Sequence, residues 1–279
     1  MSRANINGVE LHYELTGDAG PTLVLVHGAW VDHTSWRLVA PVLAETHRVV
    51  RYDRRGHSLS AGPDIHHGSR EQHEDDLAGL IEALDLGPVH LVGSSYGASV
   101  ALAVAANRPD LVRSVFAHEP PLVGVARPES SLADSLGRVA TLFALVVADL
   151  VRGQHERGAI RFIEELVLGP GSWFALPEPS RRTIVANAPT FLDLVADPAW
   201  GSVPAPADPG RAVLLSDGGV SPRWMPEIVA ALLETAYPHA RHRTFDLAGH
   251  APHLTHHAEF VETVTSFVLT VDAAFAGQP

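Results

Sequence analysis

The 279-residue chain contains neither cysteine nor lysine. Without cysteine there are no disulfides, no thiolate catalysis and no cysteine-ligated metal site, while the redox compartment stays open. All 20 basic residues are arginine and 32 residues are acidic, so the net charge is −12 with neutral histidines. Nucleic acids and anionic membranes bind basic surfaces, and this charge therefore argues against both as partners.

Membrane-targeting segments are also missing from the pattern. The first five residues lack the apolar core of a signal peptide, which predicts a cytoplasmic protein. The apolar stretch from Leu136 to Val151 is interrupted by Arg138 and Asp149. It is shorter than the roughly 20 residues of a membrane span, so we predict a helix of a cap over the active site.

The clearest catalytic motif lies in residues 89–101. A short apolar run ends in Gly93-Ser94-Ser95-Tyr96-Gly97, and a small-residue helical run follows at once. This is the strand–turn–helix context of a G-x-S-x-G nucleophile elbow, whose central serine sits on a strained turn. Ser95 is the predicted nucleophile, at a helix N-terminus where backbone N–H groups favour a developing negative charge.

Outside residues 127–204, predicted strands alternate with predicted helices on short connections. This rhythm predicts an α/β fold with a doubly wound, mostly parallel sheet. The Asn7-Gly8 pair predicts an N-terminal hairpin. The predicted strands are 22–26, 48–52, 89–92, 112–117, 212–215 and 241–247, and the predicted helices are 35–45, 70–86, 98–106, 226–236 and 258–271.

Residues 127–204 break this rhythm, because helical patterns follow one another there without strands between them. Gly-Pro-Gly and Pro-Glu-Pro breaks separate these helical patterns, and a Pro-rich stretch at 203–206 closes the segment. We therefore predict a core formed by residues 1–126 and 205–279, with residues 127–204 inserted as a helical cap.

Four motifs in order resemble the α/β-hydrolase family, in its serine-nucleophile branch. They are His27-Gly28 after an early strand, Asp53-Arg54-Arg55-Gly56-His57-Ser58, the Gly93–Gly97 elbow, and Gly249-His250 after the last strand. The resemblance implies an eight-stranded, mostly parallel sheet with an inserted cap and no cofactor. It also implies a serine–acid–histidine triad in that chain order.

The predicted base is His250, chosen by position among 17 histidines. It follows the last strand, where the sheet edge faces the elbow, and it would take the serine proton. His253, His256 and His257 are predicted at the start and on the surface of the next helix. The pairs His66-His67 and His256-His257 are interpreted as solvated loop residues, so no metal site is predicted.

Two residues compete for the role of the acid. Many family members carry an Asp before Pro in the loop after the cap, but Ser221 precedes Pro222 here, and Asp217 lies nearer the strand end. The segments 116–120 and 94–99 resemble those of the zearalenone lactonase group, whose acid is a Glu after the strand that follows the elbow helix. That resemblance implies Glu119, with Asp217 as the alternative.

The oxyanion donors implied by the family are the backbone N–H groups of Tyr96 and Ala29, with Trp30 as the fallback for the second. The loop from Asp53 to His57 is interpreted as a structural brace. Predicted substrate-binding residues are Trp30, Trp173 and Trp200, since pockets for small molecules are lined by aromatic side chains.

The haloalkane dehalogenases and epoxide hydrolases of this fold place Asp at the elbow, so Ser95 argues against both. We predict a cofactor-independent serine hydrolase for an ester or lactone of a largely apolar small molecule. The alternatives are a C–C bond hydrolase or thioesterase of natural-product metabolism, and a non-catalytic ligand-binding protein. The expected partner is a small-molecule substrate, and a homodimer is left open.

Overall fold

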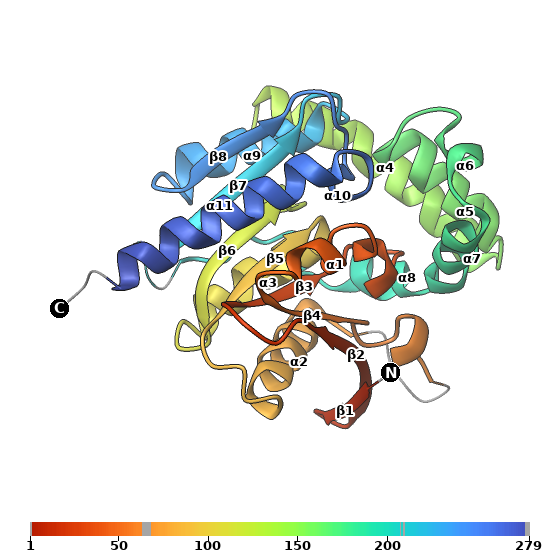
Figure 1. Cartoon of the computed structure of the whole chain (residues 1–279). Helices are drawn as coiled ribbons and strands as arrows, with labels where there is room; N and C mark the ends of the chain where they lie inside the picture. Colours follow the sequence, from red (N-terminus) through yellow and green to blue (C-terminus); the bar gives the residue numbers. More distant parts are fainter. Residues whose placement is uncertain (1, 63–67, 207, 209, 277–279) are drawn as a thin grey trace.

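An eight-stranded sheet forms the centre of the computed structural model, which describes residues 2–62, 68–206, 208 and 210–276 (Figure 1). The strand order is β1-β2-β4-β3-β5-β6-β7-β8; β3 to β8 run parallel, while β2 pairs antiparallel with β1 and β4. This confirms the predicted α/β fold with a mostly parallel sheet. The strands are β1 (Ser2–Ile6), β2 (Val9–Thr16), β3 (Thr22–Val26), β4 (Arg48–Tyr52), β5 (Val89–Ser94), β6 (Val112–His118), β7 (Ala212–Gly218) and β8 (Arg241–Phe245).

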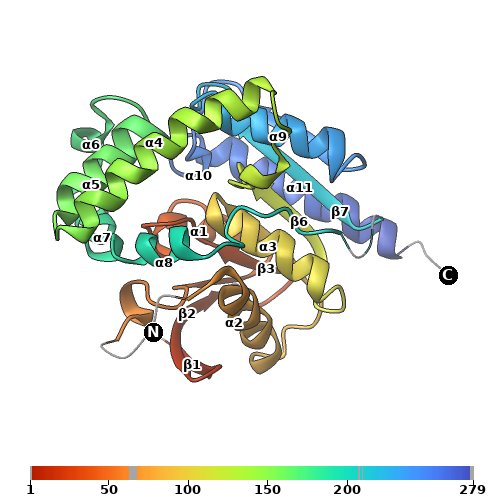
Figure 2. The ribbon, with the colours of Figure 1, turned by 180° about the vertical axis from the view of Figure 1, so that it is seen from behind.

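Helices cover both faces of the sheet, as the opposite views of Figures 1 and 2 show. Alternation along β3 decides which side chain faces which layer: Val24 and Val26 join one apolar cluster, Leu23 and Leu25 the other. Helices α2 (Arg70–Ala83), α3 (Tyr96–Asn107) and α9 (Trp224–Thr235) contribute to the first cluster. Helices α1 (Ala40–Leu43) and α11 (His257–Ala276) contribute to the second.

Local signals account for several element boundaries. Asn7 and Gly8 both take positive φ (48° and 78°), as the predicted two-residue hairpin requires. Helix α2 begins at a capping box in which Ser69 and Gln72 satisfy each other's backbone N–H groups.

The prediction of one helix over residues 35–45 is wrong. The chain forms a 3-10 helix, η1 (His33–Trp36), and then the short α1. Asp32 caps η1 by accepting the Thr34 N–H, so the cap lies before Thr34 and Ser35. Pro41 sits in the first turn of α1, where its missing N–H costs nothing, and a separate helix starts there.

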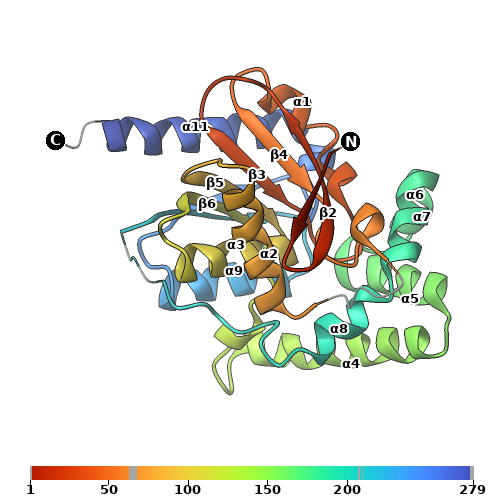
Figure 3. The ribbon, with the colours of Figure 1, turned by 90° about the horizontal axis from the view of Figure 1, so that it is seen from below.

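The segment between β6 and β7 is helical, and Figure 3 shows its helices gathered beyond one end of the sheet. These helices share cavities with Ser95, which follows β5, so that end is the one where the parallel strands finish. We call α4 to α8 the helical insertion; its division into a separate cap stays a prediction. Its elements are α4 (Ser131–Val151), α5 (His155–Arg161), the π-helical turn η4 (Phe162–Val167), α6 (Ser172–Ala175), α7 (Glu178–Asn187) and α8 (Thr190–Ala196).

Helix α4 is longer than the apolar pattern indicated. It begins at Ser131, capped by Ser130, and its 21 residues make it the one helix in the described ranges that length and composition would let cross a membrane. The sequence argument from insufficient length is therefore wrong. One side of α4 buries Val139, Val146 and Leu150, and the helix packs against α5, η4, α8 and α9.

Candidate active site

Ser95 occupies the sharp turn between β5 and α3, with φ 54° and ψ −127°. The two elbow glycines permit this turn because a side chain at either would collide with neighbouring backbone. A Cβ on Gly93 would lie 2.5 Å from Ala98 Cα, and one on Gly97 would lie 2.2 Å from the Val26 carbonyl oxygen. A positive φ on a residue with a Cβ is strained and typical of functional sites, as predicted for the elbow.

Glu119 and His250 form the closest contact among the predicted catalytic residues. Glu119 follows β6 at a second strained turn, with φ 44°, and its side chain is buried. Its Oε2 lies 2.6 Å from His250 Nδ1, and its Oε1 accepts the Gly218 N–H at 2.9 Å. The carboxylate is thus held from one side while it orients the imidazole on the other.

Asp217, the alternative acid, has a different partner. It lies within β7, and its Oδ2 is 2.7 Å from Nε2 of His242 on β8. The predicted strand ended at Leu215, two residues before Asp217, but β7 continues to Gly218. The geometry therefore favours Glu119 as the partner of His250.

The surroundings of Glu119 keep it ionised. Burial by itself would raise its pKa, but the hydrogen bond with His250 and the neighbouring His118 outweigh burial and lower the pKa to about 2. His118 Nε2 lies 3.7 Å from Glu119 Oε2. Burial lowers the pKa of His118 to about 4, so this second imidazole is neutral near pH 7. The sequence analysis did not single out His118.

Ser95 and His250 line the same two cavities. Within the described part of the chain, no hydrogen bond joins the Ser95 hydroxyl to the imidazole. Since Nδ1 of His250 is engaged by Glu119, Nε2 is the nitrogen left to receive the serine proton. Catalytic hydrogen bonds often close only around bound substrate, so this arrangement is compatible with the predicted roles.

The predicted oxyanion donors lie beside Ser95. Ala29 and Tyr96 line the smaller of the two cavities together with Ser95 and His250. A Cβ on Gly28 would lie only 3.1 Å from Ser95 Cβ, so the loop after β3 runs directly past the nucleophile. Tyr96 is the first residue of α3, so its N–H has no partner within the helix and can bind an anion.

Arg54 contacts both the loop after β3 and Tyr96, the two segments that carry the predicted donors. Its buried guanidinium donates to the carbonyl oxygens of His27 (3.1 Å) and Gly28 (2.9 Å) and lies over the Tyr96 ring, 5.1 Å from its centroid. The Gly28 carbonyl belongs to the peptide group that carries the Ala29 N–H. The predicted structural brace therefore holds the loop after β3, which carries the predicted Ala29 donor; the sequence motif alone did not indicate this contact.

Two cavities open on Ser95. The main cavity has a volume of 610 Å³ and is lined by Ala29, Trp30, Ser95 and His250 on the sheet side and by η4 and α7 of the helical insertion. The small cavity has a volume of 30 Å³ and an almost entirely apolar lining. That lining includes residues that the sequence analysis did not select, among them Pro121, Trp224 and Met225.

The three tryptophans predicted to bind substrate differ in position. Trp30 lines the main cavity and stacks on Phe162, with ring centroids 4.7 Å apart. Trp200 lines the small cavity. Trp173 lines neither cavity and is buried inside the helical insertion, so the structure corrects that prediction.

The remaining histidine predictions are partly corrected. His253 lies in the short helix α10 (Pro252–Thr255) and is buried, with its ring 4.7 Å from that of Trp36, so its prediction as a surface residue is wrong. His257 is exposed, as expected, whereas His256 is half-buried and lines the main cavity. The pair His66-His67 lies outside the described residues.

Asn187 at the end of α7 joins the helical insertion to the loop after β3. Its Oδ1 accepts the Ser58 N–H at 2.9 Å, and its Nδ2 donates to the carbonyl oxygens of Trp30 (3.4 Å) and Val31 (3.3 Å). No sequence signal marked this residue, because one polar side chain within a helix has no distinguishing pattern.

With the elbow and the Glu119–His250 pair in place, comparison with known proteins decides the family. The profile described as "Alpha/beta hydrolase family" matches residues 23–263. The chain belongs to this family. Its solved relatives include an alpha/beta hydrolase from Sphaerobacter thermophilus DSM 20745 with 26% identity and a TM-score of 0.67, covering 87% of this chain and 91% of that one.

Two curated relatives differ in how much of their length is matched. The uncharacterized hydrolase YraK of Bacillus subtilis is 38% identical over 42% of this chain, which spans only 44% of that protein. The 2-hydroxymuconate semialdehyde hydrolase of Pseudomonas sp. strain CF600 is 26% identical over 92% of this chain and 89% of its own length. The narrower resemblance to the zearalenone lactonase group rests on local segments and stays a prediction.

Proposed function

We propose that this alpha/beta hydrolase is a serine hydrolase that cleaves an ester or lactone of a largely apolar small molecule. The observation that carries the proposal is the Glu119–His250 contact of 2.6 Å, formed where the imidazole shares a cavity with Ser95. A serine hydroxyl becomes a nucleophile when a base oriented by a carboxylate removes its proton.

The proposed reaction follows from these positions. Ser95 Oγ attacks the carbonyl carbon while its proton passes to His250 Nε2, and the N–H groups of Ala29 and Tyr96 stabilise the oxyanion. The tetrahedral intermediate collapses as the C–O bond breaks, and the leaving alkoxide takes the proton from His250. Water then attacks the acyl-enzyme with His250 as base, which releases the carboxylic acid and restores Ser95.

The lining of the cavities supports an apolar substrate. Phe143, Phe162, Phe191 and Trp200 line the small cavity with Ser95. Among the described residues, Arg37 is the only arginine that lines either cavity. A carboxylate-bearing substrate binds most tightly where a buried cation pairs with it, so this lining favours an uncharged acyl group.

A panel of p-nitrophenyl esters and lactones of increasing acyl length tests the proposal. We expect turnover of uncharged, apolar members, labelling of Ser95 by a fluorophosphonate probe, and loss of both in Ser95→Ala. A wild-type protein that is folded but neither hydrolyses any member nor labels at Ser95 would instead be a ligand-binding protein. Preference for short charged acyl groups would contradict the proposed substrate class.

One observation favours a second candidate, a C–C bond hydrolase. A curated relative that matches over most of both lengths is named as a hydrolase of 2-hydroxymuconate semialdehyde, a carboxylate-bearing compound. Assaying this compound beside an uncharged ester of similar size separates the two candidates. We expect the ester to have the higher kcat/KM, because the cavities offer little to bind a carboxylate.

A further inference from the structure

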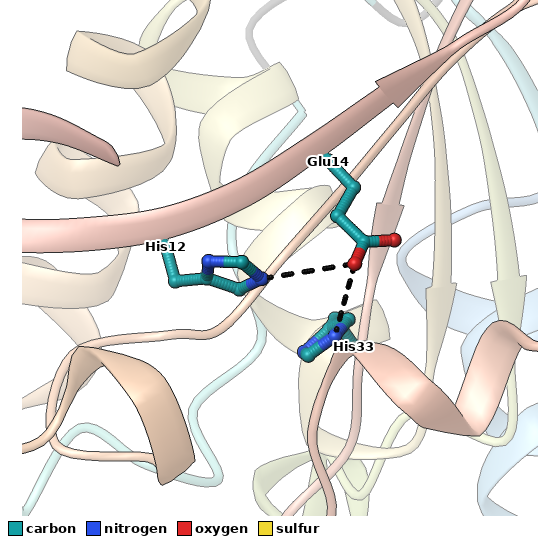
Figure 4. Close-up of side chains that lie close together, drawn as sticks. All are labelled: His12, Glu14 and His33. Carbon is teal, nitrogen blue, oxygen red and sulfur yellow. Dashed lines mark ion pairs between the residues drawn. The ribbon is translucent and has the colours of Figure 1, made fainter. Parts of the chain in front are cut away.

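A second cluster of chemically active side chains lies outside the candidate active site. It is formed by His12 and Glu14 of β2 and by His33, the first residue of η1 (Figure 4). Residues two apart on a strand project from the same face, so the sheet aims His12 and Glu14 in one direction. His33 meets them from the loop that also carries Ala29.

The three side chains converge on a common point. Glu14 Oε1 lies 3.6 Å from His33 Nε2 and 4.0 Å from His12 Nε2, as the dashed lines in Figure 4 mark. One ligand atom from each residue lies within 4.8 Å of the others. A tetrahedral zinc ion with bonds of about 2.0–2.1 Å holds its ligand atoms roughly 3.4 Å apart, so small side-chain shifts would suffice.

His12 is the element of this cluster that most needs a partner. Its side chain is 1% exposed, and neither ring nitrogen has a hydrogen bond within the described residues. Buried polar atoms are normally paired, because an unpaired one loses its hydration without compensation. Its Nε2 points toward the carboxylate of Glu14 (Figure 4).

The other two residues are held by further contacts in orientations that suit ligation. Nδ1 of His33 lies 2.6 Å from Asp53 Oδ1, which leaves Nε2 facing the cluster. A carboxylate behind a ligating histidine is the usual outer-shell arrangement of zinc sites. Arg51 Nε donates to Oε2 of Glu14 at 2.9 Å, so Oε1 remains available.

We propose that His12, Glu14 and His33 bind a divalent transition metal ion, with zinc as the best match to two imidazoles and one carboxylate, and water as the fourth ligand. The ion would tie β2 to the start of η1 and so stiffen the loop that presents the Ala29 N–H to the oxyanion. The competing occupant is a proton on His33, which would form an ion pair with Glu14 and Asp53.

Metal content tests the site without any activity assay. The full-length protein, without a histidine tag, is treated with a chelator and dialysed, then titrated with Zn²⁺ and, separately, with Co²⁺. We expect one equivalent of either ion, the intense visible absorption of four-coordinate Co²⁺, and a rise in Tm with Zn²⁺. Glu14→Gln should weaken binding at least tenfold, and His12→Gln should abolish it.

Two control variants separate this site from other histidines. His257→Gln removes an exposed histidine outside the cluster and should bind zinc as wild type does. His118, Glu119 and His250 form another group whose atoms could hold a metal. His250→Gln removes one member of that group and should still bind one equivalent of zinc. The proposal would be overturned if Glu14→Gln still bound zinc while His250→Gln did not. It would also be overturned if the wild type showed no saturable binding of one equivalent of zinc.

Glu14→Gln keeps the test decisive if the buried His12 variant fails to fold, since the Glu14 side chain is 28% exposed and Gln preserves its shape. Failure of this site would leave the ester-hydrolase proposal untouched, because that proposal is read from turnover and from Ser95 labelling. The converse also holds, since metal stoichiometry does not depend on a working nucleophile.

Discussion

At the scale of single residues, the contacts of Glu119 and Asp217 lead to opposite expectations. Glu119→Gln keeps an acceptor for the Gly218 N–H but loses the charge that orients and stabilises the His250 imidazolium. We expect kcat/KM on the best ester to fall by about 10³–10⁴-fold. Asp217→Asn, whose partner is His242, should stay within a few-fold of wild type.

Steady-state kinetics on both variants, with Tm as the control for folding, check this assignment. A fall in Asp217→Asn with near-normal Glu119→Gln would reverse the acid. A loss in both variants at wild-type Tm would mean that the two carboxylates act together.

The tryptophans give a second prediction at this scale. Trp200→Ala enlarges the small cavity beside Ser95, so we expect the preference among acyl chain lengths to shift by about tenfold or more. Trp173→Ala removes a side chain buried in the helical insertion and should instead lower the free energy of unfolding by about 3–5 kcal/mol. Ester-panel kinetics and urea unfolding distinguish the two effects. A changed acyl preference in Trp173→Ala at unchanged stability would contradict the cavity assignment.

At the scale of secondary-structure elements, the elbow depends on the close approach of α3 to β3. In Gly97→Ala the new Cβ would meet the Val26 and His27 carbonyl oxygens at 2.2 and 2.5 Å, and backbone cannot move aside cheaply. We expect a loss of about 1–3 kcal/mol in unfolding free energy, the range of overpacked interiors, together with lower activity.

Gly137→Ala is the matched control for that change. Gly137 lies within α4, and a Cβ there would meet nothing within 4 Å. Alanine is the better helix former by about 0.8–1 kcal/mol, so this variant should gain stability in the same urea experiment. Equal effects of the two substitutions would show that packing at the elbow is not what Gly97 provides.

At the scale of the whole molecule, buried neutral histidines predict sensitivity to acid. Burial lowers the pKa of His253 to about 3, from an ordinary value of 6.5. Between these two pH values the unfolded chain binds a proton that the folded chain does not, so acidification favours unfolding. The largest slope that one such group adds is about 1.4 kcal/mol per pH unit.

His253→Phe tests this dependence, because phenylalanine can keep the contacts with the rings of Trp36 and Phe260. We expect the loss of unfolding free energy between pH 6.5 and 4 to be smaller than in wild type by up to about 3 kcal/mol. Urea unfolding across this range gives the slopes. His257→Phe, at an exposed position, should leave the slope unchanged, and an unchanged slope in His253→Phe would contradict the burial argument.

The sequence predicted features that depend on neighbouring residues better than features that depend on contacts between distant parts of the chain. The strand–turn–helix context of Ser95, the hairpin at Asn7-Gly8 and the alternating elements follow local rules of turn chemistry and periodicity. The boundaries of helices were predicted less well. Asp32 and Pro41 divide the stretch that was predicted as one helix, and the cap at Ser130 starts α4 before its apolar run.

The amino-acid sequence by itself determined the order of strands and helices, the elbow and the positions of the reactive residues at strand ends, because neighbouring residues decide those features. Only the tertiary structure decided that Glu119 rather than Asp217 faces His250 across 131 residues of chain, and which tryptophans line a cavity. It likewise brought His33 to His12 and Glu14. Such meetings depend on how the sheet and its loops pack in three dimensions, which no local pattern specifies.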